Sequence, residues 1–301
     1  MLAVAEHYYQ LGGQSPINEQ VRKLTQGLAV CLAFEGPHLP IYWGNRNWHP
    51  LLADTMQTMA DDGVGRALAF VTSAYSSYSS CRQYLEDIER ARQQVGPAAP
   101  VVDKIRVFYN HPEFIEAMVE CVREALDQIP KKRRTAASIV YTAHSIPVSM
   151  ACNCRYEAQL REAARLISVA LDRPESDVVY QSRSGPPSQP WLEPDICDYL
   201  RQHRPRDAVV VPLGFVSDHM EIRYDLDIAA RRVCKEVGTH MVRAATVGLH
   251  PRFIHMVREL IVERLEERRI RPALGDDGPG WDVCASDCCP APARPGLGAR
   301  D

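Results

Sequence analysis

The chain has 301 residues, of which 46% are hydrophobic and 24% are charged, an ordinary composition for a globular protein. Its formal net charge of −3 argues against a general affinity for nucleic acid or for an anionic membrane. No window reaches the length and apolarity of a transmembrane helix, and the first residues lack the basic start and apolar core of a signal peptide. We therefore expect a cytoplasmic protein with one large or two smaller domains.

Short apolar segments alternate with amphipathic segments along most of the chain. Strands are expected at residues 39–43, 66–71, 104–109, 137–142, 177–181, 208–213 and 241–247. Helices are expected at residues 16–32, 47–59, 79–93, 112–128, 155–171, 195–203, 219–237 and 253–268. This alternation predicts an α/β fold with parallel sheets and helices on both faces. The length fits an N-terminal domain at 1–130, a C-terminal domain at 136–249, a terminal helix at 250–270 and a cysteine-containing tail at 271–301.

Two of the predicted strands deliver titratable side chains at their carboxyl ends. The strand at 137–142 is followed by His144, and the strand at 208–213 leads to a helix that carries Glu221 and Asp225 one turn apart. Ser217 or Asp218 would cap that helix, with Glu221 closing a capping box. Open α/β sheets bind ligands at this edge, and an imidazole with a carboxylate can accept protons and hold a divalent metal. The structural alternative for Glu221 is a first-turn carboxylate that complements the helix dipole.

The chain has ten cysteines, and they fall into two groups. Those inside apolar segments are expected to be small buried hydrophobic residues: Cys31, Cys81, Cys121, Cys197 and Cys234. Cys284, Cys288 and Cys289 instead lie together in a polar tail that has no core to fill. Thiolates at this spacing can hold a soft metal or an iron–sulfur cluster, and tetrahedral zinc would use the same ligands. Disorder is the alternative for the rest of the tail.

Four segments resemble the ferrochelatases, in the order of that family: YYQLGGQSPIN at 8–18, AHSIP at 143–147, QSRSGPPSQPWLEPD at 181–195 and GFVSDHMEIRYDLD at 214–227. The segments YWGNRNW at 42–48 and SAYSSYSSCRQY at 73–84 are similar to the actinobacterial type of coproporphyrin ferrochelatase. The resemblance implies two Rossmann-like domains with a cleft between them. It also implies a strand and loop before the first segment, which this chain is expected to lack because Tyr8 lies so near Met1.

The resemblance implies a lyase that inserts Fe²⁺ into a porphyrin during haem biosynthesis. His144 would be the primary metal ligand and proton acceptor, with Glu221 facing it and Asp225 extending a relay; His219 would orient Glu221 or cap its helix. Relatives extend the relay with a further acid where this chain has Ala229. Porphyrin contacts would come from Tyr8, Ser15 and Tyr109, although Ser15 could simply cap its helix and Tyr109 could simply pack.

The resemblance further implies a [2Fe–2S] cluster on the three tail cysteines and one distant cysteine, with Cys154 the first candidate and Cys152 the second. The absence of an apolar lip favours coproporphyrin over protoporphyrin as the substrate. A haem-pathway enzyme is a possible partner for product hand-off. Two alternatives stay open: a cobaltochelatase of the same fold using His144 and His219, and a truncated, non-catalytic protein that binds haem or an iron–sulfur cluster.

Overall fold

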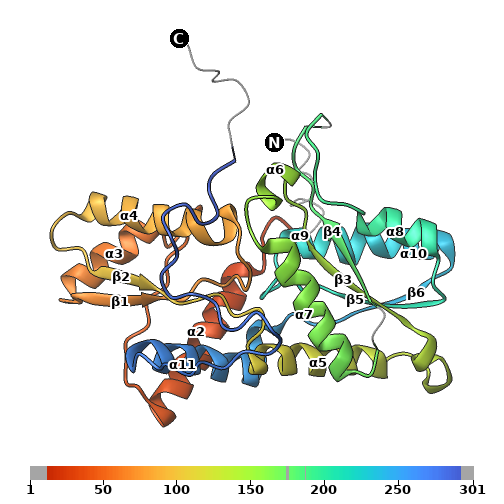
Figure 1. Ribbon diagram of the computed structural model, residues 1–301, viewed down its shortest axis with the longest axis horizontal. Helices are drawn as coiled ribbons and strands as arrows, with labels where there is room; N and C mark the ends of the chain where they lie inside the picture. Colours follow the sequence, from red (N-terminus) through yellow and green to blue (C-terminus); the bar gives the residue numbers. More distant parts are fainter. Residues whose placement is uncertain (1–11, 174–175, 187, 293–301) are drawn as a thin grey trace.

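The computed structural model describes residues 12–173, 176–186 and 188–292, and it contains two parallel sheets that lie side by side (Figure 1). The N-terminal sheet pairs β1 (Arg66–Ala69) with β2 (Val101–Lys104). The C-terminal sheet has the order β4-β3-β5-β6, with all its pairs parallel. Its strands are β3 (Ser138–His144), β4 (Asp177–Gln181), β5 (Asp207–Val211) and β6 (His240–Arg243). The predicted α/β class with parallel sheets is confirmed.

Helices connect the strands and cover both sheets (Figure 1). The N-terminal half contains α2 (Ile17–Glu35), α3 (Leu52–Asp61), the π-helix η1 (Tyr78–Arg82), α4 (Gln83–Val95), α5 (Pro112–Asp127) and the 3₁₀-helix η2 (Lys131–Ala136). The C-terminal half contains α6 (Val148–Ala151), α7 (Tyr156–Ala170), α8 (Ile196–His203), α9 (Met220–Tyr224), the π-helix η3 (Asp225–Ala230), α10 (Arg231–Val237), η4 (Val247–Leu249) and α11 (Pro251–Leu265). Within the described ranges, no helix is long and apolar enough to cross a membrane.

One hydrophobic core extends through both halves of the molecule. It joins Leu28 of α2 and Met118 of α5 to Val209 of β5 and Phe253 of α11. α11 packs against both α2 and α5, and the three helices lie along the same side of the molecule in Figure 1. The division into domains at residues 130–135, where η2 lies, stays a prediction because this core crosses it.

The N-terminal half differs most from the predicted elements. Residues 39–43 form no strand, and β2 begins at Val101 and ends at Lys104 instead of spanning 104–109. The reason is that residues beyond Ile105 leave the sheet and pair with the tail: Arg106 donates to the Pro272 carbonyl at 3.0 Å, and Asn110 donates to the Leu274 and Gly278 carbonyls at 3.1 and 2.9 Å. The tail from Pro272 to Gly278 is therefore packed, and disorder is wrong for this part of it.

Candidate active site

The candidate site forms where β3, β4 and β5 end at the same edge of the C-terminal sheet. His144 is the last residue of β3, and the chain leaves β5 through Gly214 to reach α9. Gly214 lies against β3, where its amide donates to the Thr142 carbonyl at 2.9 Å and an added Cβ would lie 2.7 Å from the Cα of Ala143. Any larger residue would push this loop off β3, so the glycine sets the distance between α9 and His144.

The imidazole of His144 faces the carboxylate of Glu221. The distance from Nε2 of His144 to Oε2 of Glu221 is 3.8 Å, and the two side chains are 30% and 49% exposed. Nδ1 of His144 donates to the backbone carbonyl of Ser145, which places the ring proton on Nδ1 in the neutral form. The lone pair of Nε2 is then directed toward the open side of the site, where it can bind a metal ion or accept a proton.

His219 caps α9, as one of the two roles predicted for it, and Ser217 and Asp218, the other predicted caps, do not. Nδ1 of His219 accepts from the Glu221 amide at 3.2 Å, so α9 begins at Met220. The hydroxyl of Ser217 is buried and has no hydrogen-bond partner among the described residues. The imidazole replaces the hydroxyl as the cap because it lies directly over the first amides of the helix, and it also stands 3.8 Å from Oε2 of Glu221.

Asp225 continues the acidic face into a π-helix. The single helix predicted at 219–237 is in fact α9, η3 and α10 in succession, with Asp225 the first residue of η3. Its carboxylate accepts from the hydroxyl of Ser182 and, at 3.4 Å, from the side-chain amide of Gln181 at the end of β4. π-Helical turns are frequent at functional sites because their wider turn redirects side chains.

The protonation behaviour of the site follows from burial and from these charges. Burial alone would lower the pKa of His144, but Glu221, the Ser145 carbonyl and Asp225 together raise it above 6.5. Burial would raise the pKa of Glu221, yet His144 and His219 lower it below its ordinary value. The pKa of Asp225 is raised, first by burial and then by repulsion from Glu221. The pair therefore favours an ionised Glu221 beside an imidazole that holds its proton more strongly than a free histidine does.

The described residues among the predicted porphyrin contacts, Ser15 and Tyr109, have hydrogen-bond partners outside the His144–Glu221 pair. Tyr8 falls outside the described residues, and the hydroxyl of Ser15 accepts from the Ile17 amide at 3.4 Å at the start of α2. Tyr109 is 2% exposed and donates to Asp277 at 3.1 Å. A porphyrin contact from the Tyr109 hydroxyl thus requires the tail around Asp277 to move.

Two tyrosines that the sequence analysis did not single out connect Tyr109 to the site. The ring of Tyr75 lies 6.4 Å from that of Tyr109 and 6.1 Å from that of Tyr156. Tyr75 donates to the Leu213 carbonyl, and Tyr156 donates to the His144 carbonyl, both at 3.0 Å. These buried aromatic residues therefore fix the backbone at the end of β3 and just after β5 by hydrogen bonds. Tyr75 lies within the segment SAYSSYSSCRQY, whose similarity to the family was the sequence signal that could have identified it.

The tail thiols gather around η1. Cys81 is 5% exposed, as expected for a buried cysteine, but its thiol lies near enough to Cys284 to lower the pKa of Cys284. Sγ of Cys288 lies 3.7 Å from Sγ of Cys289. Cys154 is near enough to Cys288 and Cys289 to interact with them electrostatically. Cys81 is thus a member of this group that the sequence analysis assigned to packing alone.

The cluster of thiols has the ligand chemistry that a soft metal prefers, but the described side chains do not form a complete set of ligands around one point. Two thiolates bound to one tetrahedral ion at about 2.3 Å are about 3.8 Å apart, which agrees with the Cys288–Cys289 separation of 3.7 Å. However, among the residues with described positions, no three or more His, Cys, Asp or Glu side chains are arranged to hold a metal ion. The thiols are gathered at one place, and a full ligand shell is not formed.

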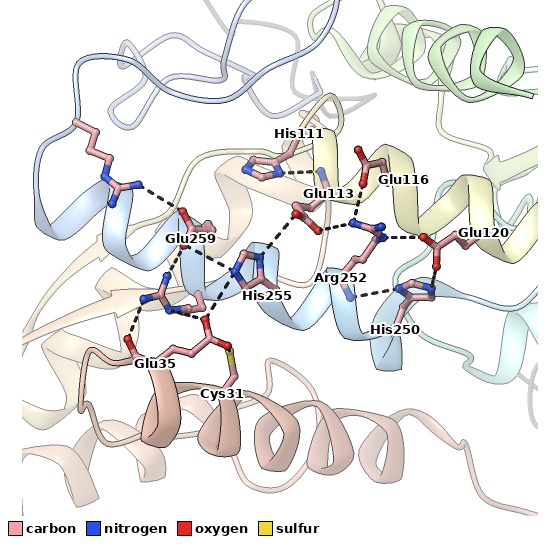
Figure 2. Close-up of polar contacts among 12 residues, drawn as sticks. Cys31, Glu35, His111, Glu113, Glu116, Glu120, His250, Arg252, His255 and Glu259 are labelled. Atoms are coloured by element: carbon pink, nitrogen blue, oxygen red, sulfur yellow. Dashed lines mark hydrogen bonds and ion pairs between the residues drawn. The ribbon is translucent and has the colours of Figure 1, made fainter.

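A second histidine–carboxylate cluster lies on the outer helices α2, α5 and α11 (Figure 2). His255 stands 3.8 Å from Glu35, 3.8 Å from Glu113 and 4.0 Å from Glu259. Arginines already pair with the carboxylates of this surface: Arg258 with Glu35 and Glu259, Arg268 with Glu259, and Arg252 with Glu113, Glu116 and Glu120. This arrangement is a surface ion-pair network in which the acids have cationic partners.

Solved structures place the fold among the chelatases. The sirohydrochlorin chelatase SirB from Bacillus subtilis subspecies spizizenii, in complex with cobalt, superposes with a TM-score of 0.56 at 14% identity, covering 83% of this chain and 90% of that one. A multi-domain protein of Deinococcus radiodurans with structural similarity to chelatases superposes with a TM-score of 0.57 at 16% identity, covering 87% of this chain and 53% of that one. At these identities the likeness establishes the fold alone.

Sequence comparison then fixes the family. A model of the ferrochelatase family matches residues 1–265, and the chain belongs to that family. The chain is 51% identical to a ferrochelatase of Rhodopirellula baltica, over 98% of this chain and 85% of the relative. It is 46% identical to a coproporphyrin III ferrochelatase of Nocardia farcinica, over 99% of this chain and 89% of the relative. The enzyme therefore inserts a metal ion into a porphyrin in haem biosynthesis, with Fe²⁺ as its substrate. Membership of the ferrochelatase family argues against the alternative of a cobaltochelatase.

Proposed function

We propose that the chain is a coproporphyrin III ferrochelatase in which His144 and Glu221 perform the metal insertion. The observation that carries this proposal is the pair itself, with Nε2 of His144 facing Oε2 of Glu221 at 3.8 Å over an exposed edge of the sheet. The similarity to the Nocardia farcinica coproporphyrin III ferrochelatase supports the choice of porphyrin. A cytoplasmic location and hand-off to a later enzyme of haem synthesis complete the proposal.

The chemistry requires the loss of two pyrrole N–H protons and the dehydration of Fe²⁺. The neutral imidazole of His144, with its proton held on Nδ1 by the Ser145 carbonyl, presents Nε2 to the metal or to a pyrrole proton. Glu221 stays ionised beside His144 and His219, and its negative charge stabilises the imidazolium that forms when Nε2 takes a pyrrole proton. Asp225, whose raised pKa allows proton exchange nearer to neutral pH, passes the proton on along η3.

Ser15 and Tyr109 are proposed to contact the propionate side of the porphyrin, together with Tyr8. Ser15 is partly exposed at the start of α2, where free amides of the first helical turn favour an anionic group. For Tyr109, the hydrogen bond to Asp277 must break, and Asp277 keeps its ion pair with Arg155 at 2.7 Å as an alternative partner.

The test is an anaerobic assay with Fe²⁺ and either coproporphyrin III or protoporphyrin IX, with the metallated product identified by mass. We expect turnover of both to be measurable and kcat/KM to be higher for coproporphyrin III, since its four propionates gain more from a polar site. Equal or reversed preference would overturn the choice of porphyrin. Tight haem binding without iron insertion would instead support the non-catalytic alternative.

We also propose that the tail thiols hold a [2Fe–2S] cluster, with Cys284, Cys288 and Cys289 as ligands. For the fourth ligand, Cys81 is favoured over Cys154 and Cys152, because its thiol is the one that interacts with Cys284 and lowers its pKa. Thiolate ligands are what such a cluster requires, and when bound it would attach the tail to η1. Cys154 remains the competing candidate because it interacts electrostatically with Cys288 and Cys289.

Protein purified without oxygen tests the cluster. We expect a red-brown colour with visible absorption, and two iron atoms and two sulfides per chain, by analogy with clusters held on four thiolates. Cys81→Ser should abolish the absorption, and Cys154→Ser should leave it unchanged. Cys234→Ser is the matched control, because Cys234 is a buried cysteine on α10 that is not among the proposed ligands. A colourless protein that contains zinc, or loss in Cys154→Ser with retention in Cys81→Ser, would contradict these assignments.

A further inference from the structure

The segment that carries the acidic site residues is fastened at both ends by one arginine. Arg243 is the last residue of β6, and its guanidinium binds two carboxylates at once. Its Nη1 and Nη2 donate to Asp218 at 3.1 and 2.9 Å, and its Nε and Nη2 donate to Asp227 at 2.7 and 3.3 Å. Thr246 adds a hydrogen bond to Asp218 at 3.2 Å. Both pairs are therefore bidentate, the geometry that a planar guanidinium forms and an ammonium does not.

The fastened segment contains the proposed catalytic groups. Asp218 precedes Glu221 by three residues and Asp227 follows Asp225 by two, so the two anchors enclose His219, Glu221 and Asp225. α9 has only five residues and passes directly into the π-helix η3. A helix of this length has little stability of its own, so its position must come from tertiary contacts.

Burial makes the arginine an effective anchor. The side chains of Arg243, Asp218 and Asp227 are 13%, 14% and 20% exposed, which limits screening by solvent. Arg223 of α9 also pairs with Asp227, at 3.4 Å, from the exposed side. The guanidinium is thus covered by the segment that it holds, and it touches neither His144 nor Glu221 directly within the described structure.

We propose that Arg243 is a positioning residue for metal insertion: it fixes the 218–227 segment so that Glu221 faces His144. The inference rests on the proposed roles of these two residues. A displacement of about 1 Å in such a pair costs on the order of 10²-fold in rate. Arg243 would therefore act on kcat through Glu221 and leave the binding of porphyrin nearly unchanged.

A double-mutant cycle tests this coupling. Arg243→Lys keeps the charge but cannot bind both carboxylates in a bidentate manner, so we expect kcat to fall at least about tenfold and the porphyrin KM to change less than about twofold. In a Glu221→Gln background, the same change should lower kcat less than about twofold, because the interaction it positions has already been removed. Equal losses of kcat in both backgrounds would overturn the proposal.

The matched control is Arg106→Lys. Arg106 is another buried arginine in a bidentate pair, with Glu263 of α11 at 2.6 and 2.9 Å, and neither residue belongs to the 218–227 segment. Both variants should unfold at a lower temperature, but only Arg243→Lys should lower kcat. If Arg106→Lys lowers kcat to the same extent, Arg243 has only a general stabilising role.

Hydrogen–deuterium exchange gives a result that does not depend on turnover. Amides of residues 219–227 should exchange faster in Arg243→Lys than in the unmodified protein, and at an unchanged rate in Arg106→Lys. Unchanged exchange in Arg243→Lys would contradict the inference even if the enzyme proved inactive for other reasons. Absence of iron insertion by the unmodified protein would contradict the proposed function instead, so the two failures are distinguishable.

Discussion

Two clusters in this molecule combine histidine with glutamate, and they differ in what accompanies the carboxylates. In the cluster of Figure 2, Glu35, Glu113 and Glu259 all have arginine partners as well as His255. At the edge of the C-terminal sheet, Glu221 pairs with His144 and His219, and no arginine or lysine pairs with it in the described part of the chain. From this comparison we expect that residue types alone do not define a metal-handling site, and that the carboxylate must also be free of an arginine or lysine partner.

The placement of arginine explains the difference. Around His255 the guanidinium groups lie among the acids on the surface, where each pair is worth little and metal binding would have to displace them. In the candidate active site, Arg243 lies behind the acidic segment and binds Asp218 and Asp227. The positive charge there fixes the backbone and leaves Glu221 available to a cation or a proton.

The largest expected effect separates the two histidines. His144→Ala should reduce iron insertion by at least about 10³-fold, since it removes both the metal ligand and the proton acceptor. His255→Ala should change kcat/KM less than twofold. Steady-state rates, with circular dichroism to show that both variants fold, provide the measurement. Near-normal turnover by His144→Ala would remove the catalytic assignment.

Removal of one carboxylate charge should have a smaller effect. Glu221→Gln keeps the size of the side chain but loses the negative charge that stabilises the protonated imidazole of His144, so kcat should fall by about 10²-fold. Glu259→Gln, in the arginine-rich cluster, should leave kcat unchanged. The comparison would fail if the two variants lost activity equally.

The pH dependence should distinguish the pair from an isolated imidazole. His144 is active when neutral, so activity should rise as pH increases through its pKa, which Glu221 and the Ser145 carbonyl hold above 6.5. In Glu221→Gln, burial is no longer offset by that carboxylate, so the midpoint of the rise should move to lower pH. A pH–rate profile of both proteins measures this shift; a midpoint that stays in place or moves upward would contradict the interpretation.

The smallest effect is expected at the far end of the acidic face. Asp225→Asn should lower kcat about three- to tenfold, because protonated His144 can still release its proton to water without the relay. Ser182 and Gln181 retain a polar partner in this variant, so the fold should be preserved. A loss as large as that of Glu221→Gln would make Asp225 a primary catalytic group.

Local patterns in the sequence were sufficient for the C-terminal sheet. The apolar runs that became β3, β4 and β5 are continuous and bounded by polar residues; His144 ends β3, and Glu221 lies on α9, the helix that follows β5. The pairing of these two residues is the geometric consequence of parallel strands that end at the same edge.

The features that the sequence did not predict depend on contacts between distant segments. Cys81 meets Cys284 only because the tail returns to η1, and β2 ends early only because Arg106 and Asn110 turn toward that tail. Arg243 lies sixteen residues after Asp227 on a different element. For the cap of α9 the sequence offered Ser217, Asp218 and His219, and the local path of the chain selects His219 because its imidazole lies over the first amides of the helix.

The packed tail has a consequence for any shortened form of this protein. Asp277 accepts from Tyr109 and pairs with Arg155 of α7, while the carbonyls of Leu274 and Gly278 receive the buried amide of Asn110. In a chain that stopped at Ile270, the side chains of Tyr109 and Asn110 would lose these hydrogen-bond acceptors. Truncation there is therefore expected to lower the free energy of unfolding of the whole enzyme, since residues 272–278 connect Tyr109 of the N-terminal half with Arg155 of the C-terminal half through Asp277.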